Sequence, residues 1–137
     1  MNEERSTMKA VVYLRPGVIE VRDVPKPEPE PGEVLIRVRA TGVCGSDMHI
    51  YSEGRLGSQI ITDPLILGHE MSGQVEALGE GVTSLSVGQA AAVEPQLACG
   101  YCLPCRTGNY NVCPNVRFMG QPSKQGTMAE YVTVPAK

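Results

Sequence analysis

The sequence predicts a mainly β domain, and three observations carry this prediction. Segments in which apolar and polar residues alternate recur along the chain, as they do in strands with one buried face. Glycine and proline are frequent, with 15 and 11 in 137 residues, which favours many short elements joined by turns. A composition that is 42% hydrophobic and 20% charged is ordinary for a globular chain. We therefore expect about one domain with a core of its own.

The strands can be placed in order along the chain. An apolar β-branched segment, a turn signal at residues 15–17 and an alternating segment together predict an N-terminal β-hairpin. Residues 25–32 alternate proline with charge, which predicts an extended connection. Alternation then predicts further strands in the rest of the chain. The predicted strands cover residues 8–14, 18–24, 33–40, 71–78 and 127–135.

A short helical turn is predicted at residues 45–51. Ser46 is of a type that caps helix N-termini, and Asp47 falls in the first turn, where a negative charge is favourable. Residues 1–7 are polar and charged, and we expect them to form an extension before the domain of residues 8–137.

The bulk properties also limit location and partners. The N-terminal extension lacks the apolar stretch and cleavage site of a secretory signal, and the apolar runs are too short to cross a bilayer. The formal net charge of -3 gives no basic footprint for nucleic acid. We therefore expect a cytoplasmic protein that has neither a membrane nor a nucleic acid as partner.

Four of the five cysteines lie in one short segment, which we call the cysteine lobe (residues 95–119). Two residues separate Cys99 from Cys102 and Cys102 from Cys105, and Cys113 follows after seven more. Four thiolates suit tetrahedral zinc, and a site with four protein ligands is closed to substrate. In a reducing compartment, close thiols are more often metal ligands than disulfides. We predict one structural zinc ion; disulfides, an iron–sulfur cluster and a nucleic-acid-reading zinc ribbon are the alternatives.

A second group of metal-ligand types is spread more widely. Cys44 lies between two glycines, and His69 and Glu70 follow 25 residues later. Thiolate, imidazole and carboxylate are the protein ligands of open zinc sites, in which the remaining position holds water or substrate. His49 competes with His69 as a ligand. Singly, the cysteine and the histidine are ordinary buried residues and Glu70 an ordinary surface carboxylate.

Three motifs in register resemble the medium-chain alcohol dehydrogenases. The first is GHExxGxxxxxGxxV, seen as Gly68, His69, Glu70, Gly73, Gly79 and Val82; the others are the CGSD element at Cys44 and the cysteine lobe. The resemblance covers residues 8–137. Within that family the CGSDxH element that ends at His49, residues 54–57 and residues 108–111 resemble the polyol branch, typified by sorbitol and xylitol dehydrogenases.

The resemblance implies a fold and a set of roles. The fold would be a GroES-like, partly open β-barrel with a zinc lobe. Cys44 and His69 would hold a catalytic zinc ion, with Glu70 as a third ligand directly or through water. Ser46 would hydrogen-bond the substrate hydroxyl and pass its proton outward, and Asp47 would orient His69. With the structural zinc, two zinc ions per chain are expected. Ile50 stands where the polyol branch often has an aromatic residue, so the substrate pocket is less defined.

The reaction implied by the resemblance is oxidation of a polyol or secondary alcohol to the ketone, with hydride passing to NAD or NADP in a complete, homo-oligomeric enzyme. Such an enzyme needs a Rossmann domain with a GxGxxG turn, which this sequence lacks. We therefore expect a fragment, with residues 8–137 as an incomplete catalytic domain that does not turn over alone. Two alternatives stand beside it: a zinc-binding or interaction module that has lost catalysis, and a domain acting on threonine, butanediol or an aldonate.

Overall fold

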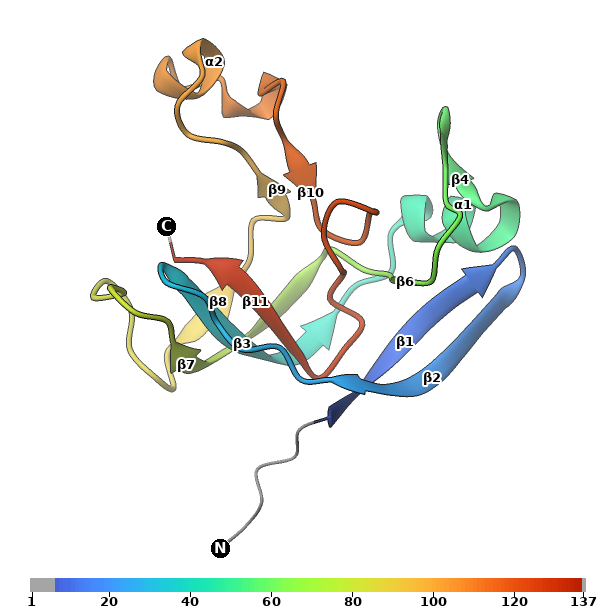
Figure 1. Cartoon of the computed structure of the whole chain (residues 1–137), viewed down its shortest axis with the longest axis horizontal. Coiled ribbons are helices and arrows are strands. Elements are labelled where there is room, and N and C mark those ends of the chain that lie inside the picture. The colour runs from blue at the N-terminus through green and yellow to red at the C-terminus, as the bar shows by residue number, and fades with distance from the viewer. Residues whose placement is uncertain (1–6, 137) are drawn as a thin grey trace, which may run out of the picture.

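The computed structural model describes residues 7–136, and strands dominate this part of the chain. The polar segment of residues 1–6 lies outside the described residues. Figure 1 shows two sheet regions side by side, with a lobe that projects from them. The strands are β1 (Thr7–Arg15), β2 (Val18–Pro25), β3 (Glu33–Thr41), β4 (Arg55–Leu56), β5 (Gln59–Ile60), β6 (Leu65–Ile66), β7 (Met71–Leu78), β8 (Ala90–Ala92), β9 (Gln96–Leu97), β10 (Arg117–Phe118) and β11 (Tyr131–Pro135). The prediction of a mainly β domain is confirmed.

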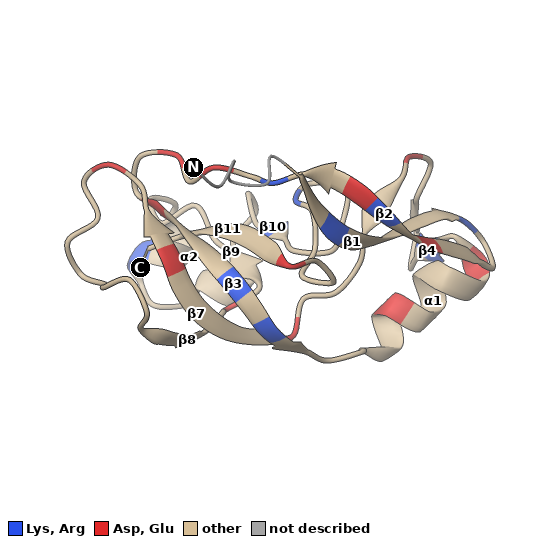
Figure 2. Cartoon of the chain, turned by 90° about the horizontal axis from the view of Figure 1, so that it is seen from below, with Lys and Arg blue, Asp and Glu red and all other residues tan. Residues whose placement is uncertain are grey.

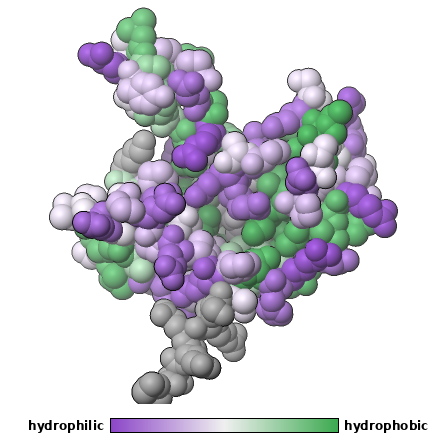
Figure 3. Space-filling view, in the orientation of Figure 1, coloured by the Kyte–Doolittle hydropathy of each residue, from purple (hydrophilic) through white to green (hydrophobic). Residues whose placement is uncertain are grey.

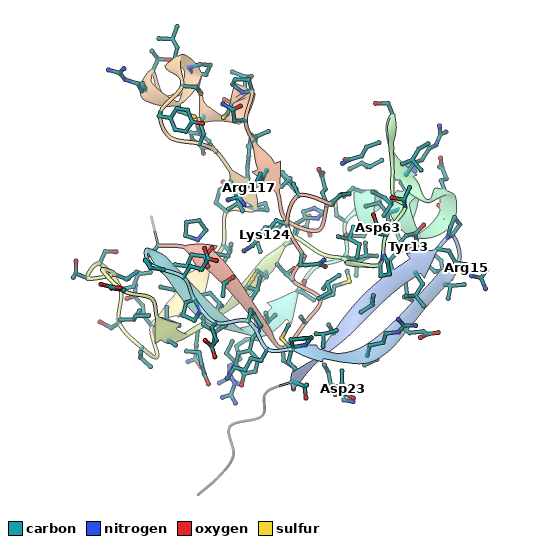
Figure 4. The ribbon with its side chains drawn as sticks, viewed as in Figure 1. Tyr13, Arg15, Asp23, Asp63, Arg117 and Lys124 are labelled. Carbon is teal, nitrogen blue, oxygen red and sulfur yellow. The ribbon has the colours of Figure 1, made fainter. Side chains whose placement is uncertain are left out.

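The N-terminal hairpin forms as predicted. β1 pairs antiparallel with β2, and its other edge pairs with the short strand β6. The turn uses Gly17, whose φ of 75° lies in the left-handed region that glycine adopts without steric cost. Tyr13 on β1 (Figure 4) is fully buried among apolar side chains from α1 (Gly45–Glu53) and from residues 61–67.

The second sheet contains four strands in the order β11-β3-β7-β8. Every pairing in it is antiparallel, and β3 is central, so Val34 and Ile36 form the middle of the main core. An isolated bridge between Ala10 and Ala129 connects this layer to the hairpin layer. Among residues 7–136 no strand pairing is parallel, so the described elements contain no parallel dinucleotide-binding sheet.

The helix α1 begins one residue before the predicted cap. Its N-cap is Cys44 and not Ser46, which is a correction to the sequence-based expectation. The reason is that Asp47, at the third helical position, reaches back and accepts a hydrogen bond from the Cys44 backbone N–H at 2.9 Å. The helix ends at Gly54, which adopts the left-handed conformation.

The cysteine lobe stands out from the sheets on a two-stranded stem. β9 pairs with β10 at its base, and the lobe itself contains α2 (Leu103–Arg106) and a 3-10 turn (Tyr110–Val112). Figure 1 shows α2 at the far end of this projection. Figure 3 shows hydrophobic surface at the tip of the projection, where Leu103 is 75% exposed.

Charges of both signs are scattered over the surface, as Figure 2 shows, with no single-sign face in that view. Among residues 7–136, no helix has both the length and the apolar character needed to cross a membrane.

Candidate metal centres

The four cysteines of the lobe come together in space. Cys102 is the N-cap of α2, Cys105 lies within this short helix, and Cys113 follows the 3-10 turn. Their sulfur atoms, with that of Cys99, all lie within 4.8 Å of one another. Gly100 and Gly108 have φ values of 82° and 83°, which allow the tight turns that this clustering requires.

The sulfur separations fit one tetrahedral zinc ion. With Zn–S bonds of about 2.3 Å, tetrahedral geometry places sulfur atoms about 3.8 Å apart. The Sγ atoms of Cys102 and Cys113 are 3.8 Å apart, and those of Cys99 and Cys105 are 3.9 Å apart. The Cys102–Cys105 separation is shorter, at 3.4 Å. All five cysteines are free, so the lobe contains no disulfide, and the predicted clustering is confirmed.

The thiols of this cluster perturb one another. Burial acts to raise the pKa of Cys99, but hydrogen bonds from the backbone N–H groups of Cys102 and Tyr101 and from neighbouring thiols outweigh it and lower the pKa to about 6. For Cys102, a hydrogen bond from the Cys105 backbone acts to lower the pKa. Burial and hydrogen bonds to the other thiols outweigh that bond and raise the pKa to about 12. One proton therefore leaves this cluster readily, and a soft cation would displace the others.

The second candidate centre lies between the start of α1 and the start of β7. Cys44 caps the helix, and His69 and Glu70 directly precede Met71, the first residue of β7. One ligand atom from each of these three residues lies within 4.8 Å of the others. Cys44 is half-buried, His69 is 9% exposed and Glu70 is exposed, so the group opens to solvent on one side. This donor set suits zinc with a position left for another ligand.

Asp47 holds the two halves of this centre together. One carboxylate oxygen accepts the Cys44 backbone N–H, and the other accepts the Gly68 backbone N–H at 3.0 Å. The same oxygen is 3.8 Å from Nδ1 of His69, which is longer than a hydrogen bond. The contacts of Asp47 with the centre therefore run through the backbone on either side of it.

The ring of His69 is also packed from the lobe side. It meets Phe118 on β10 edge to face, with ring centroids 5.3 Å apart. Such aromatic pairs restrict ring orientation. The stem of the cysteine lobe thus contributes to the second centre, although its cysteines do not.

The structure brings together some of the predicted residues and not others. Cys44, His69 and Glu70 converge, whereas His49 points elsewhere: its Nδ1 lies 3.1 Å from Glu53 Oε1, and its side chain is 64% exposed. Ser46 is half-buried in the first turn of α1, two residues from Cys44. The role of Ser46 stays a prediction.

Other residues near the centre carried no signal in the sequence. Phe118 and Thr127 come from segments far along the chain, and Thr41 lies three residues before Cys44 at the end of β3, but none of the three is of a metal-ligand type. Ile50, at the position where the polyol branch often has an aromatic residue, is 1% exposed and belongs to the core with Tyr13.

An antiparallel β domain with two groups of side chains that could hold a metal ion is the arrangement expected of a metal-binding domain. The chain belongs to the alcohol dehydrogenase GroES-like domain family, whose model matches residues 30–137. It is 42% identical over 125 residues, 91% of the chain, to a sorbitol dehydrogenase from Bacillus subtilis.

Solved structures show the same relationship. An alcohol dehydrogenase from Escherichia coli CFT073 complexed with NADH aligns with 96% of the chain at 38% identity and a TM-score of 0.84. A cobalt- and zinc-bound thermostable alcohol dehydrogenase from Pyrobaculum aerophilum aligns with 95% at 36% identity and a TM-score of 0.83. The chain covers 35% of the sorbitol dehydrogenase and 37% and 39% of these two solved chains.

Proposed function

We propose that this chain is the zinc-binding catalytic domain of a dehydrogenase that oxidises a polyol or secondary alcohol to the ketone with NAD or NADP. The observation that carries the proposal is the convergence of Cys44, His69 and Glu70 within 4.8 Å beside a separate four-cysteine site. Family membership and the similarity to a sorbitol dehydrogenase support the reaction type and favour polyols over threonine, butanediol or aldonates.

The chain's own residues fit this chemistry. Cys44, His69 and Glu70 would hold a zinc ion, which as a Lewis acid lowers the pKa of a bound alcohol. Ser46, close to Cys44 on the first turn of α1, would hydrogen-bond the substrate hydroxyl and pass its proton outward. The hydride acceptor would be a nicotinamide, as the NADH complex of the similar E. coli structure supports.

The cysteine lobe has a separate task in this proposal. Its four thiolates leave no position for substrate, so a zinc ion there stabilises the fold of the lobe and takes no part in the reaction. Two zinc ions per chain are therefore proposed, one structural and one catalytic.

A cytoplasmic location and a homo-oligomeric state of the complete enzyme are also part of the proposal. Five free cysteines, four of them clustered, suit a reducing compartment. The oligomeric state rests on the family resemblance alone.

Metal analysis of the purified chain tests the proposal. We expect two zinc ions per chain, with Cys44→Ser losing one and Cys99→Ser losing the other. A single zinc ion that survives Cys44→Ser would contradict the catalytic site and favour a zinc-binding module without catalysis.

Turnover gives a second test. We expect no NAD-dependent oxidation of sorbitol by the 137-residue chain, because residues 7–136 contain no dinucleotide-binding sheet. Robust turnover would contradict the proposal that this catalytic domain needs a separate nucleotide-binding domain for the reaction.

A further inference from the structure

The backbone on either side of the His69–Glu70 pair is held by hydrogen bonds from other segments of the chain. The carbonyl of Glu70 accepts two hydrogen bonds, one from the Gly42 N–H at 2.7 Å and one from the Thr41 hydroxyl at 3.1 Å. The carbonyl of Gly68 accepts the N–H of Thr127 at 2.9 Å. The peptide group before His69 and the one after Glu70 are therefore held by residues outside the ligand set.

A pair of threonine hydroxyls, one buried and one on an exposed residue, connects these contacts. Thr127 is fully buried, and its Oγ1 lies 3.0 Å from Oγ1 of Thr41. A hydroxyl has one proton to donate, and Thr41 gives its proton to the carbonyl of Glu70. Thr127 must therefore be the donor within the pair. The chain of donation runs from Thr127 through Thr41 to Glu70, and each bond polarises the next.

The hydroxyl of Thr127 also lies on the side of Gly68 where another residue would carry its Cβ. Oγ1 of Thr127 would be 2.9 Å from a Cβ added there. Thr127 thus donates its N–H to the carbonyl of Gly68, and its hydroxyl oxygen occupies the space that a Cβ at Gly68 would need. Loss of the hydroxyl would leave Thr41 without its buried donor and free to rotate away from Glu70.

We propose that Thr127, acting through Thr41, is a positioning residue for the metal ligands His69 and Glu70. This inference rests on the proposed catalytic metal site. Metal ligands bind well only when their orientation is held, and loss of a supporting hydrogen bond around a metal site costs about 10- to 100-fold in affinity. Thr127 sets that orientation from the core, whereas Asp47 does so from α1.

The structure offers a matched control for Thr127→Val. Thr133 on β11 is 7% exposed, and its Oγ1 accepts a hydrogen bond from Lys124 Nζ at 3.2 Å. It is a buried, hydrogen-bonded threonine like Thr127, but its partner belongs to no metal site. Thr133→Val removes the same hydroxyl and should cost similar stability.

The test is a Co²⁺ titration of the 137-residue chain by absorption, with the second site assigned by its loss in Cys44→Ser. We expect Thr127→Val and Thr41→Val each to bind Co²⁺ at this site about tenfold more weakly or worse. Thr127→Ser, which keeps the hydroxyl, and Thr133→Val should stay close to the parent. Thr41 is exposed, so its variant provides the reading if Thr127→Val fails to fold.

A measurement on metal-free protein separates the positioning role of Thr127 from the existence of the metal site. Amide hydrogen exchange of Gly42, measured by NMR on metal-free protein, should be faster in Thr127→Val than in Thr133→Val. If Thr127→Val and Thr41→Val both bound Co²⁺ with the affinity of the parent, the positioning role would be overturned and the metal site would remain. A parent chain that binds one ion, unaffected by Cys44→Ser, would remove the metal site and the positioning role with it, whatever the exchange shows.

Discussion

The carboxylate of Asp47 accepts a hydrogen bond from the backbone N–H of Gly68, 21 residues further along the chain. Its second oxygen accepts the N–H of Cys44. Asp47 is 3% exposed, so both bonds are shielded from water and are charge-assisted. A single side chain thus fixes the distance between the two segments that carry the proposed catalytic ligands.

Replacing this carboxylate should cost stability as well as metal binding. In Asp47→Asn the amide NH₂ would face one of two N–H donors, so one hydrogen bond would be lost and a donor left unpaired. We expect the free energy of unfolding to fall by about 2–4 kcal/mol, measured by urea unfolding in the presence of zinc. The control is Asp63→Asn, because Asp63 is exposed and bonds only its neighbour Thr62 among the contacts described. Equal stability of the two variants would contradict the linking role of Asp47.

The cysteine lobe should depend on metal more than the sheets do. We expect Cys99→Ser to lose one zinc ion per chain and to lose amide protection between residues 99 and 113. Protection in β3 and β7 should persist, because their core is formed by aliphatic side chains such as Val34 and Val75. The measurement is hydrogen exchange with zinc analysis on the same samples, and Cys44→Ser serves as the control that keeps the lobe zinc. A Cys99→Ser protein with parental resistance to heat and chelator would contradict the structural zinc.

The long strands could be predicted from the sequence and the short ones could not. β3 and β7 span nine and eight residues, enough for apolar alternation to be visible. β4, β5, β9 and β10 have two residues each, too few for any periodicity. The last strand begins at Tyr131 and not near residue 127, because residues 126–128 donate their N–H groups to the carbonyls of residues 66–68 instead.

The candidate metal ligands could be predicted from the sequence, but the residues that fix their positions could not. Cys44, His69 and Glu70 stand out because thiolate, imidazole and carboxylate are metal ligands in any context. Thr41 and Thr127 meet across 86 residues, and a threonine hydroxyl has no spacing that indicates such a pair. The expected cap at Ser46 was wrong because the carboxylate of Asp47 accepts the backbone N–H of Cys44, which makes Cys44 the N-cap.

Glycine packing behind His69 leads to a third prediction. An added Cβ at Gly126 would fall within the backbone carbonyl oxygens of Ile66, Leu67 and Gly68. Backbone atoms cannot move aside as a flexible side chain can, so Gly126→Ala should lower the free energy of unfolding by about 3 kcal/mol. Gly45→Ala is the control, since Gly45 has a negative φ and no neighbouring atom within 4 Å of an added Cβ. Urea unfolding of both proteins checks this, and a Gly126→Ala chain as stable as Gly45→Ala would show that the carbonyls do not pack as described.

Tyr13 carries a polar atom that the core does not satisfy. The side chain is fully buried, and its hydroxyl has no hydrogen-bond partner among the described residues. Tyr13→Phe removes only this hydroxyl, so we expect stability to stay the same or rise by about 1 kcal/mol. Tyr13→Ala would leave a cavity beside Ile50 and should cost about 3–5 kcal/mol. A marked loss of stability in Tyr13→Phe would indicate a bound water or another partner at the hydroxyl.

The same burial gives Tyr13 a signature at alkaline pH. Burial raises the pKa of Tyr13 above its ordinary value of 10.0, so the folded chain keeps a proton that the unfolded chain releases. The stability that this proton contributes is fully present below pH 10 and is lost as the pH rises through the folded pKa. We therefore expect the parent to lose stability more steeply than Tyr13→Phe as the pH rises above 10. Urea unfolding across this range measures the difference, with Tyr101→Phe as the control because Tyr101 is 72% exposed. If the free energy of unfolding fell equally with pH in the parent and in Tyr13→Phe, the Tyr13 hydroxyl would have to ionise as easily in the folded chain as in the unfolded one.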